Sequence, residues 1–500
     1  MASTAVVVAA PRTALNKEAR PASLWRRTLV GFALVAGSLG LLGTALPIGV
    51  ALLIALPVLA VWFWRQPVRS VYVLMAGAVL IEIFPLHFAD SMTDRIPLFL
   101  NLNNTAGFDF PITPAEILMI TAVGVAVVKA ASDRRLHWPS GRLVGAYWIY
   151  LVAVLGAEFH GMLSGGDLKT SLWEMRPQVY GFVLFGLTTT LLEDRRQLQQ
   201  LVLVFLFAAL VKAVIGDYRY FITLQRQVGT QLEVLAHEDS YFLGLFVAGG
   251  VAAFVWLKNR RIWLALAFGT PVALIAMLAN SRRAGAYALV GALLVIYVIA
   301  YRLEPELRKK LAIVGVIGLI CAVAFLAYAW NKQYGIQAQL VRPVRSLIDP
   351  SVRDFLSDQY RNAENANLKL TFQQSPIIGV GFGRPFLLAY PMADISRIYP
   401  LWNVIPHNSL MWVGMRMGAL GFAAFWGLIG LAILQGFAVA RGTRDPFVRA
   451  VVAVCLAAIV AEVMVGYADL QLESYRNLIV LGVVLGVLNR LPQLREVADV

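Results

Sequence analysis

Residues 262–301 read IWLALAFGTPVALIAMLA, then NSRR, then AGAYALVGALLVIYVIAY, so two apolar runs of 18 residues flank a polar turn of four. An uncharged apolar run of this length is long enough for one helix to cross the ~30 Å hydrocarbon layer of a bilayer. Backbone N–H and C=O groups inside lipid must pair within their own segment, which favours helices. The stretch therefore predicts two membrane-spanning helices joined by a tight turn.

Similar apolar runs recur along the chain of 500 residues. Hydrophobic residues make up 59% of the sequence and charged residues only 14%, against about 25% charged residues in a soluble domain. We therefore expect an all-α fold, a polytopic transmembrane helical bundle of about 14 spans with both ends in the cytoplasm. The expected spans are residues 29–43, 46–64, 68–86, 113–131, 142–159, 176–192, 198–215, 241–257, 262–279, 284–301, 310–330, 408–438, 447–466 and 474–489.

Basic residues recur in every second connection between spans, as in WRQPVR at 64–69, KNRR at 258–261 and RGTR at 441–444. The positive-inside rule places such short basic loops in the cytoplasm. This placement accounts for most of the net charge of +14 without a nucleic-acid partner. The expected organisation is a cytoplasmic N-terminal tail at 1–28, eleven spans at 29–330, a large periplasmic loop at 331–407, three spans at 408–489 and a cytoplasmic tail at 490–500.

The loop at 331–407 is long and polar, and a loop of this length is usually functional. Its stretch 350–374 has helical spacing, so the loop is expected to be partly helical. The residues expected to make its apolar contacts are Phe355, Tyr360, Leu368 and Phe372.

The two cysteines, Cys321 and Cys455, both lie inside apolar runs. This placement indicates neither a disulfide framework nor a metal site.

Arg282 and Arg283 lie in a short turn on the expected periplasmic side, where the positive-inside rule disfavours them. Two adjacent guanidiniums at a membrane surface indicate a bound anion or a carboxylate partner, and arginine binds phosphate through two parallel hydrogen bonds. Interfacial snorkelling or a structural ion pair is the alternative. Arg361 and Arg384 in the loop are further candidate ligands for substrate.

Arg176 is expected to begin the sixth span on the same side, because Pro177 suits the first turn of a helix. The partial positive charge of a helix start would add to that of the guanidinium in binding an anion. Glu174 is the ion-pair partner expected if Arg176 is only structural.

His407 and Asn408 close the long loop and open the next span, and Asn408 is a further candidate ligand for substrate. A histidine at this level can act as a base or a hydrogen-bond donor near neutral pH, or can be structural.

Residues 237–239, His-Glu-Asp, look like a metal cluster, but adjacent side chains point in different directions. Helix N-capping by Asp239 or Ser240 is the preferred interpretation.

Lys212 and Arg416 lie inside predicted spans, where ionisable side chains are candidates for function, here substrate binding. The acids expected to pair with such cations are Glu82, Glu116 and Glu462.

The glycine-rich GVGFGR stretch at 379–384 has no strand before it and no Lys-Ser/Thr after it. It is therefore interpreted as a backbone turn and not a nucleotide site.

Three motifs surround the long loop: NSRRAG at 280–285, SPIIGVGFG at 375–383 and PHNSLMWVGMRMGALGF at 406–422. In order, spacing and expected side of the membrane they resemble the O-antigen ligase and O-antigen polymerase family of bacterial membrane glycosyltransferases. The close resemblance covers roughly residues 270–435, and Arg176 occupies a position like that of the family's upstream Arg.

This resemblance implies an inner-membrane enzyme that moves a glycan from an undecaprenyl-diphosphate carrier to an acceptor hydroxyl at the periplasmic face. The acceptor would be a glycan or a lipid-linked glycan. The resemblance assigns activation of the acceptor hydroxyl to His407, and binding of the diphosphate to Arg282 and Arg176. It implies neither a cofactor nor a metal.

Chemical considerations point the same way. Breaking a glycosyl–diphosphate bond develops negative charge on the departing phosphate, which preorganised guanidiniums stabilise most strongly in the transition state. A single displacement with a histidine base would invert the anomeric centre. The alternatives are a transporter or flippase for a lipid-linked or anionic solute and a non-catalytic membrane scaffold, although the internal symmetry typical of transporters is not visible in the sequence.

Overall fold

The computed structural model describes residues 30, 48–83, 93, 96–102, 111–134, 139–226, 234–332, 335–397 and 399–498. In these ranges the chain forms helices and turns and no strand, which confirms the all-α prediction. The helices before the long loop are α2 (Ile48–Arg65), α3 (Arg69–Leu80), α6 (Pro114–Ser132), α7 (Arg142–Leu163), α8 (Leu168–Leu191), α9 (Arg195–Tyr218), α10 (Asp239–Trp256), α11 (Arg260–Ala279), α12 (Arg283–Leu303) and α13 (Arg308–Ala329). The loop contains α14 (Gly335–Ile348) and α15 (Val352–Gln374), and α16 (Ser409–Gly442), α17 (Pro446–Ala468) and α18 (Tyr475–Ala498) follow it.

Ten of the described helices are long and apolar enough to cross a membrane, and two shorter apolar helices precede them. Every predicted span from 46–64 onward overlaps a helix. The predicted span 29–43 lies outside the described residues apart from residue 30. The polytopic architecture is therefore confirmed, and the total of fourteen spans stays a prediction.

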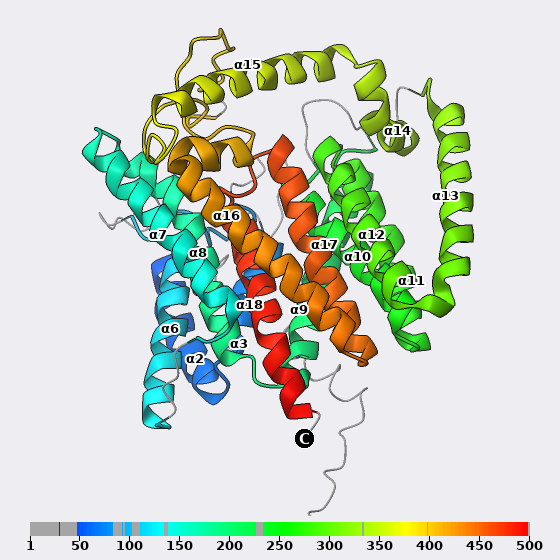
Figure 1. Cartoon of the computed structure of the whole chain (residues 1–500), viewed down its shortest axis with the longest axis horizontal. Coiled ribbons are helices and arrows are strands. Elements are labelled where there is room, and N and C mark those ends of the chain that lie inside the picture. Colours follow the sequence, from blue (N-terminus) through cyan, green and yellow to red (C-terminus); the bar gives the residue numbers. More distant parts are fainter. Residues whose placement is uncertain are drawn as a thin grey trace, which may run out of the picture.

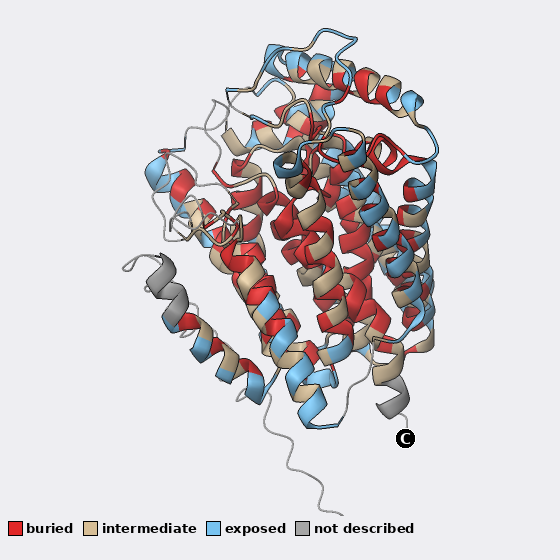
Figure 2. Cartoon of the chain, turned by 90° about the vertical axis from the view of Figure 1, so that its left-hand side faces the viewer, coloured by how far each residue is buried: buried red, intermediate tan, exposed pale blue. Residues whose placement is uncertain are grey.

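The helices pack side by side in a bundle, and α15 crosses one end of it (Figure 1). We call this the loop end. Figure 2 shows buried residues concentrated in the middle helices and exposed residues at the ends and on outer faces. Helix α13 lies at the edge of the bundle, where Ala329 is its one buried residue.

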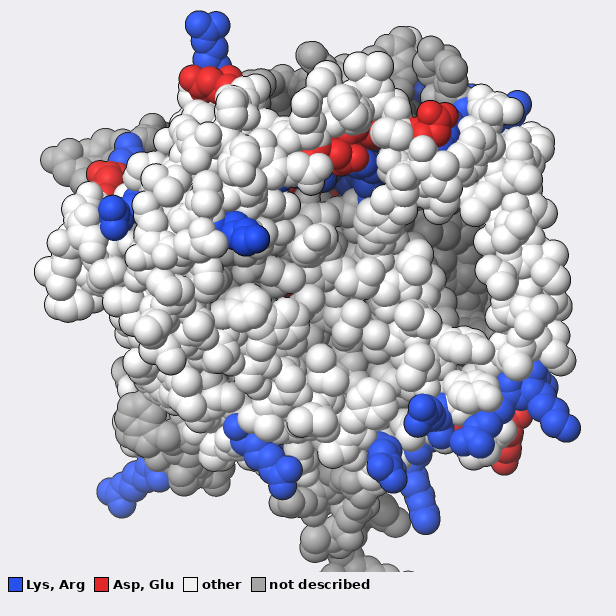
Figure 3. Space-filling view, turned by 45° about the horizontal axis from the view of Figure 1, so that its top comes forward, with Lys and Arg blue, Asp and Glu red and all other residues white. Residues whose placement is uncertain are grey.

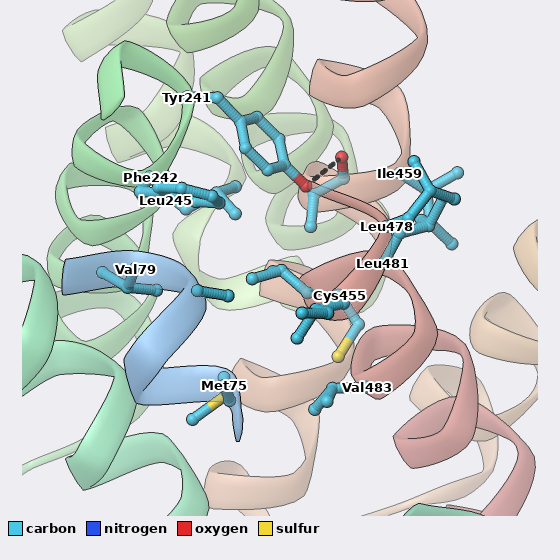
Figure 4. Close-up of a cluster of buried hydrophobic side chains, with 14 of the residues drawn as sticks. Met75, Val79, Tyr241, Phe242, Leu245, Cys455, Ile459, Leu478, Leu481 and Val483 are labelled. Atoms are coloured by element: carbon cyan, nitrogen blue, oxygen red, sulfur yellow. Dashed lines mark hydrogen bonds between the residues drawn. The ribbon is translucent and has the colours of Figure 1, made fainter. Parts of the chain in front are cut away.

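The core combines helices that are far apart in the sequence. Helix α17 packs against α10, α12 and α16, and α18 lies along α8. Figure 4 shows Met75 of α3, Tyr241 of α10, Cys455 of α17 and Val483 of α18 meeting in one apolar cluster, where the Tyr241 hydroxyl donates to the Ala458 carbonyl at 3.2 Å.

A cavity of about 660 Å³ lies between the ends of α9, α11 and α17 that are remote from α15. Its lining is mainly Leu, Val and Ala side chains, with Arg195 and Arg196 near its mouth. The cavity contains neither His407 nor Arg282. This cavity therefore does not mark the position of the candidate site residues.

Charge is distributed unevenly between the two ends. Figure 3 shows Lys and Arg predominating along the lower edge, whereas a group of acidic and basic side chains lies close together near the loop end. The helix ends at the lower edge carry the basic connections of the sequence, including Arg65, Arg260 and Arg441.

The predicted loop helix at 350–374 is confirmed as α15, which Ser351 caps by accepting a hydrogen bond from the Asp354 backbone N–H. Leu368 is buried, as expected for an apolar contact. The prediction for Phe355 is wrong, because its side chain is 55% exposed. Ion pairs, and not apolar contacts alone, hold this end of α15.

Candidate active site

Two bidentate ion pairs fasten α15 to the loop end of the bundle. Arg283, the first residue of α12, donates to both oxygens of Asp358 at 2.6 and 3.1 Å. Arg342 of α14 contacts both oxygens of Asp354 at 2.6 and 3.2 Å and donates to the Ser281 carbonyl at 3.0 Å. These pairs fix the face of α15 that carries Arg361 and Glu364.

His407 and Glu364 form a histidine–carboxylate dyad under α15. The His407 Nδ1 lies 3.1 Å from Glu364 Oε1, and the His407 backbone N–H donates to Oε2 at 3.0 Å. Glu364 is 1% exposed and His407 is 23% exposed, so the carboxylate is buried behind a partly accessible ring. With the Nδ1 proton donated to Glu364, the Nε2 lone pair is the reactive end of the ring.

Local structure places the His407 ring. Asn408 caps α16, because its side-chain oxygen accepts from the Met411 backbone N–H at 3.0 Å, and His407 is the residue just before this cap. The Tyr360 ring stands edge-on to the imidazole at 5.7 Å. Asn408, predicted to bind substrate, is buried and donates to Asn365 at 3.2 Å.

Arg282 belongs to a second network of contacts at the loop end of the bundle. Its Nη2 donates to Nε2 of His237, whose Nδ1 lies 3.3 Å from Asp469 Oδ2. Burial and the neighbouring Arg361 lower the pKa of Arg282 to about 10, although Asp469 raises it, so the guanidinium remains charged at neutral pH. His237 precedes α10 and Asp469 follows α17, so three remote segments meet here.

Helix α15 joins the two sets of contacts. Arg361 lies close enough to influence the pKa values of Arg282, His237 and Asp469, and Glu364 contacts His407 one turn further along α15. Residues three apart on a helix face have Cβ atoms about 5–6 Å apart. Ser409, two residues after His407, also contacts the Asp469 carbonyl at 3.4 Å. The structure thus links the His407 dyad and the Arg282 contacts through neighbouring residues of α15.

Arg176 lies elsewhere. Asp167 caps α8 by accepting from the Thr170 backbone N–H, so the helix begins at Leu168 and Arg176 lies two turns inside it. The prediction that Arg176 and Pro177 start a span is therefore wrong. Arg176 contacts Glu116 at 3.2 Å and donates to Asn101 at 3.0 Å and to the Pro111 carbonyl. No contact within the described part of the chain joins it to Arg282 or His407.

Glu174, expected to pair with Arg176, pairs instead with Arg416 of α16 at 2.6 Å. The remaining Arg416 nitrogens donate to the carbonyls of Gly381 and Val404 at 3.1 and 2.8 Å, and its side chain is fully buried. We interpret Arg416, predicted to bind substrate, as a clamp on the loop. Half-buried Arg384 lies beside it.

The glycine-rich stretch is the segment that this clamp holds. Gly383 donates its backbone N–H to Glu174 at 2.7 Å, and a Cβ at Gly381, which has φ of 81°, would lie 2.3 Å from the Gly161 nitrogen of α7. Only glycine fits a left-handed backbone pressed this closely against a helix. The interpretation of residues 379–384 as a turn agrees with this geometry.

Lys212 is likewise enclosed. It contacts Glu82 and lies 3.5 Å from Asp239, with both side chains fully buried. The predicted pairing of Glu82 with an intramembrane cation is confirmed, whereas Glu462 accepts hydrogen bonds from Asn477. Asp239 does not cap α10 as predicted, because it pairs with Arg476 of α18.

Two acids of this site, Glu364 and Asp469, were absent from the sequence-based list of candidates. Arg361 and Glu364 are three residues apart in a stretch with helical spacing, which is a usable signal that both share one face. Asp469 offers no such signal, since its partner His237 lies 232 residues away.

The segment that carries most of this site resembles a known family. Residues 269–426 match the family model for O-antigen ligase. This part of the chain is similar to the O-antigen ligase family. No curated protein matches the chain.

The O-antigen ligase match runs from within α11 into α16, so it contains Arg282, Arg361, Glu364 and His407. His237 and Asp469 lie outside it. The apolar helices are those of a multi-pass membrane protein, and the match supports an enzyme of the O-antigen ligase or polymerase type.

Proposed function

We propose that this ligase transfers a glycan from an undecaprenyl-diphosphate carrier to an acceptor hydroxyl at the periplasmic face of the bacterial inner membrane. The observation that carries the proposal is the His407–Glu364 dyad, in which Glu364 lies one helical turn from Arg361, whose charge acts on Arg282. A base and an anion-binding group at such spacing suit a reaction that deprotonates a hydroxyl and releases a diphosphate.

His407 takes the base role. Its Nε2 accepts the proton of the acceptor hydroxyl while Glu364, bonded to Nδ1, holds the ring and stabilises the imidazolium that forms. The acceptor oxygen attacks the anomeric carbon from the face opposite the diphosphate, so the reaction inverts the configuration. No step requires a metal ion.

Arg282 and Arg361 take the anion role. They face the negative charge that develops as the glycosyl–oxygen bond breaks, at a partly buried site where such charge stabilisation is strong. Arg176, whose guanidinium is already bonded to Glu116 and Asn101, is not needed for this arrangement.

The basic connections at the end remote from α15 support a periplasmic site, because the positive-inside rule places them in the cytoplasm. The buried cations Lys212 and Arg416 have carboxylate partners in the structure. Their placement therefore gives the transporter alternative no support.

The test uses purified protein in lipid nanodiscs with a defined undecaprenyl-diphosphate glycan and a glycan acceptor, with the product identified by mass spectrometry. We expect His407→Ala to lower the transfer rate by about 10²–10⁴-fold through loss of the base. Arg282→Ala should lower it by about 10²–10³-fold through loss of charge stabilisation.

Matched controls are His160→Ala, on α7 outside the site, and Arg444→Ala, exposed at the opposite end. Both should retain the wild-type rate. Undiminished transfer by both site variants at equal protein amount would refute the proposal, and flux of the lipid-linked glycan without any transfer product would favour the transporter.

A further inference from the structure

A second histidine–carboxylate dyad lies beside the first. In the His407 dyad the carboxylate of Glu364 contacts Nδ1 at 3.1 Å, and in the other the carboxylate of Asp469 contacts His237 Nδ1 at 3.3 Å. His237 is 35% exposed and Asp469 is 4% exposed, which repeats the pattern of a buried acid behind a partly accessible ring. In both dyads Nε2 is therefore the end turned away from the carboxylate.

The two dyads differ in what their Nε2 atoms face. His237 Nε2 contacts the Arg282 guanidinium, the proposed ligand of the diphosphate. His407 contacts Glu364, which lies three residues from Arg361 on α15, and among the residues that the structure describes its Nε2 makes no hydrogen bond with Arg282. One imidazole is thus placed for the acceptor and the other for the leaving group.

The charges around His237 oppose one another. It is faced by Asp469 at the end of α17, by Glu238 in its own segment, by Arg361 of α15 and by Arg282 of the α11–α12 turn. Burial alone would lower the pKa of His237, but the Asp469 and Glu238 carboxylates outweigh burial and Arg361 and raise it. Burial alone would likewise raise the pKa of Asp469, but His237, Arg361 and Arg282 hold it well below its ordinary value.

The contact with Arg282 restricts the protonation of His237. An N–H of the guanidinium can donate only to a neutral imidazole whose Nε2 carries a lone pair. A dianionic diphosphate arriving at Arg282 offers that N–H a stronger acceptor. Nε2 is then released from the Arg282 hydrogen bond, and Asp469 favours its protonation.

We infer that His237, oriented by Asp469, is the general acid that protonates the departing diphosphate, opposite the base His407. The inference rests on the proposed function and deepens it. The acceptor O–H proton passes to His407 Nε2, and the acceptor oxygen bonds to the anomeric carbon. The bond from that carbon to the phosphate oxygen breaks, its electron pair stays on the oxygen, and the proton on His237 Nε2 passes to this oxygen.

Exchange of protons with water returns both histidines to their starting protonation states. After product release His407 gives its proton to water, and His237 takes one when the next donor binds. The sum is hydroxyl plus glycosyl diphosphate giving glycoside plus protonated lipid diphosphate, with no other reactant.

The test compares pH–rate profiles of kcat/KM for wild type, His237→Gln, Asp469→Asn and the matched control His160→Gln. The glutamine oxygen at 237 can still accept a hydrogen bond from Arg282, so a purely positioning role should leave the profile nearly unchanged. An acid role predicts that the rate of His237→Gln falls by about 10²-fold and that the alkaline decline seen in wild type disappears.

Asp469→Asn removes the charge that favours the protonated ring, so its alkaline decline should move to lower pH. This variant also decides the question if His237→Gln does not accumulate as folded protein. If kcat/KM of both variants declined at alkaline pH as it does in the wild type, the inference would be overturned. Full activity of His407→Ala would instead overturn the proposed function, so the two failures are distinguishable.

Discussion

Two groups of charged residues occupy the loop end of the bundle, and they differ in access. The sealed cluster consists of Glu82, Lys212, Arg219, Asp239 and Arg476, whose side chains are at most 2% exposed. The open cluster consists of His237, Arg282, Glu364, His407 and Asp469, in which the two imidazoles are 35% and 23% exposed. His237 and Asp239 are two residues apart, yet they belong to different clusters.

The two clusters pair their carboxylates with different partners. In the sealed cluster cations meet carboxylates directly, as Arg476 meets Asp239 and Lys212 meets Glu82. In the open cluster carboxylates face the Nδ1 atoms of two partly exposed imidazoles, which leaves each Nε2 for another partner. Ionic partners satisfy a buried charge, whereas a histidine backed by a carboxylate retains a function for its second nitrogen.

The largest expected effect comes from opening the sealed cluster. Arg476→Met would leave the buried Asp239 with only the more distant Lys212, at 3.5 Å, as a cation, and breaking a buried pair on one side costs about 3–5 kcal/mol. The free energy of unfolding in detergent micelles should fall by that amount. Arg444→Met, at an exposed position, is the control, and equal stability of both variants would contradict the role of the sealed cluster.

A smaller effect is expected from changing the acid of the first dyad in the open cluster. Glu364→Gln keeps the shape of the side chain but removes the charge that orients His407 and stabilises its protonated form. Transfer should slow by about 10²-fold with little change in KM. The control is Glu306→Gln at an exposed position, and an unchanged kcat in Glu364→Gln would show that the dyad does not act in catalysis.

Glu473 sharpens the comparison further, because it is a buried acid next to the open cluster with no cation partner in the described part of the chain. Burial raises the pKa of Glu473 to about 8, although its hydrogen bond from Ser409 lowers it. Between the ordinary pKa of 4.5 and about pH 8, Glu473 is therefore protonated in the folded chain and deprotonated in the unfolded chain.

Wild-type stability should consequently fall by about 1 kcal/mol per pH unit across that window as the pH rises. Glu473→Gln mimics the protonated acid and should lose this pH dependence. Unfolding free energies of the two proteins at pH 5, 6, 7 and 8 test the prediction, and parallel curves would rule out a buried protonated Glu473.

The smallest effect is expected for the tether that carries α15. The Arg283–Asp358 pair is bidentate, but Asp358 is 42% exposed, so solvent screens it and its coupling should be below about 1 kcal/mol. A double-mutant cycle with Arg283→Met and Asp358→Asn measures that coupling directly. Arg283→Met should slow transfer only a few-fold, in contrast to Arg282→Ala, and a loss equal to that of Arg282→Ala would place Arg283 in the site.

The sequence determined the membrane architecture, because the length and apolar content of each run are local properties. The span expected at 262–279 matches α11, and the helix expected at 350–374 matches α15 almost to the residue. The motifs around the loop also led to the prediction that His407 and Arg282 are site residues. Local signals failed at α8, where the cap formed by Asp167 starts the helix before Arg176 and Pro177.

Only the tertiary structure decided which charges meet. Glu174 has Arg176 two residues away yet pairs with Arg416, which is 242 residues distant, and Asp469 meets His237 across 232 residues. Partner choice of this kind depends on how the helices pack and on the desolvation of each group, which no local stretch of sequence encodes. For that reason the spans were predictable, whereas the division of the charged residues into a sealed and an open cluster was not.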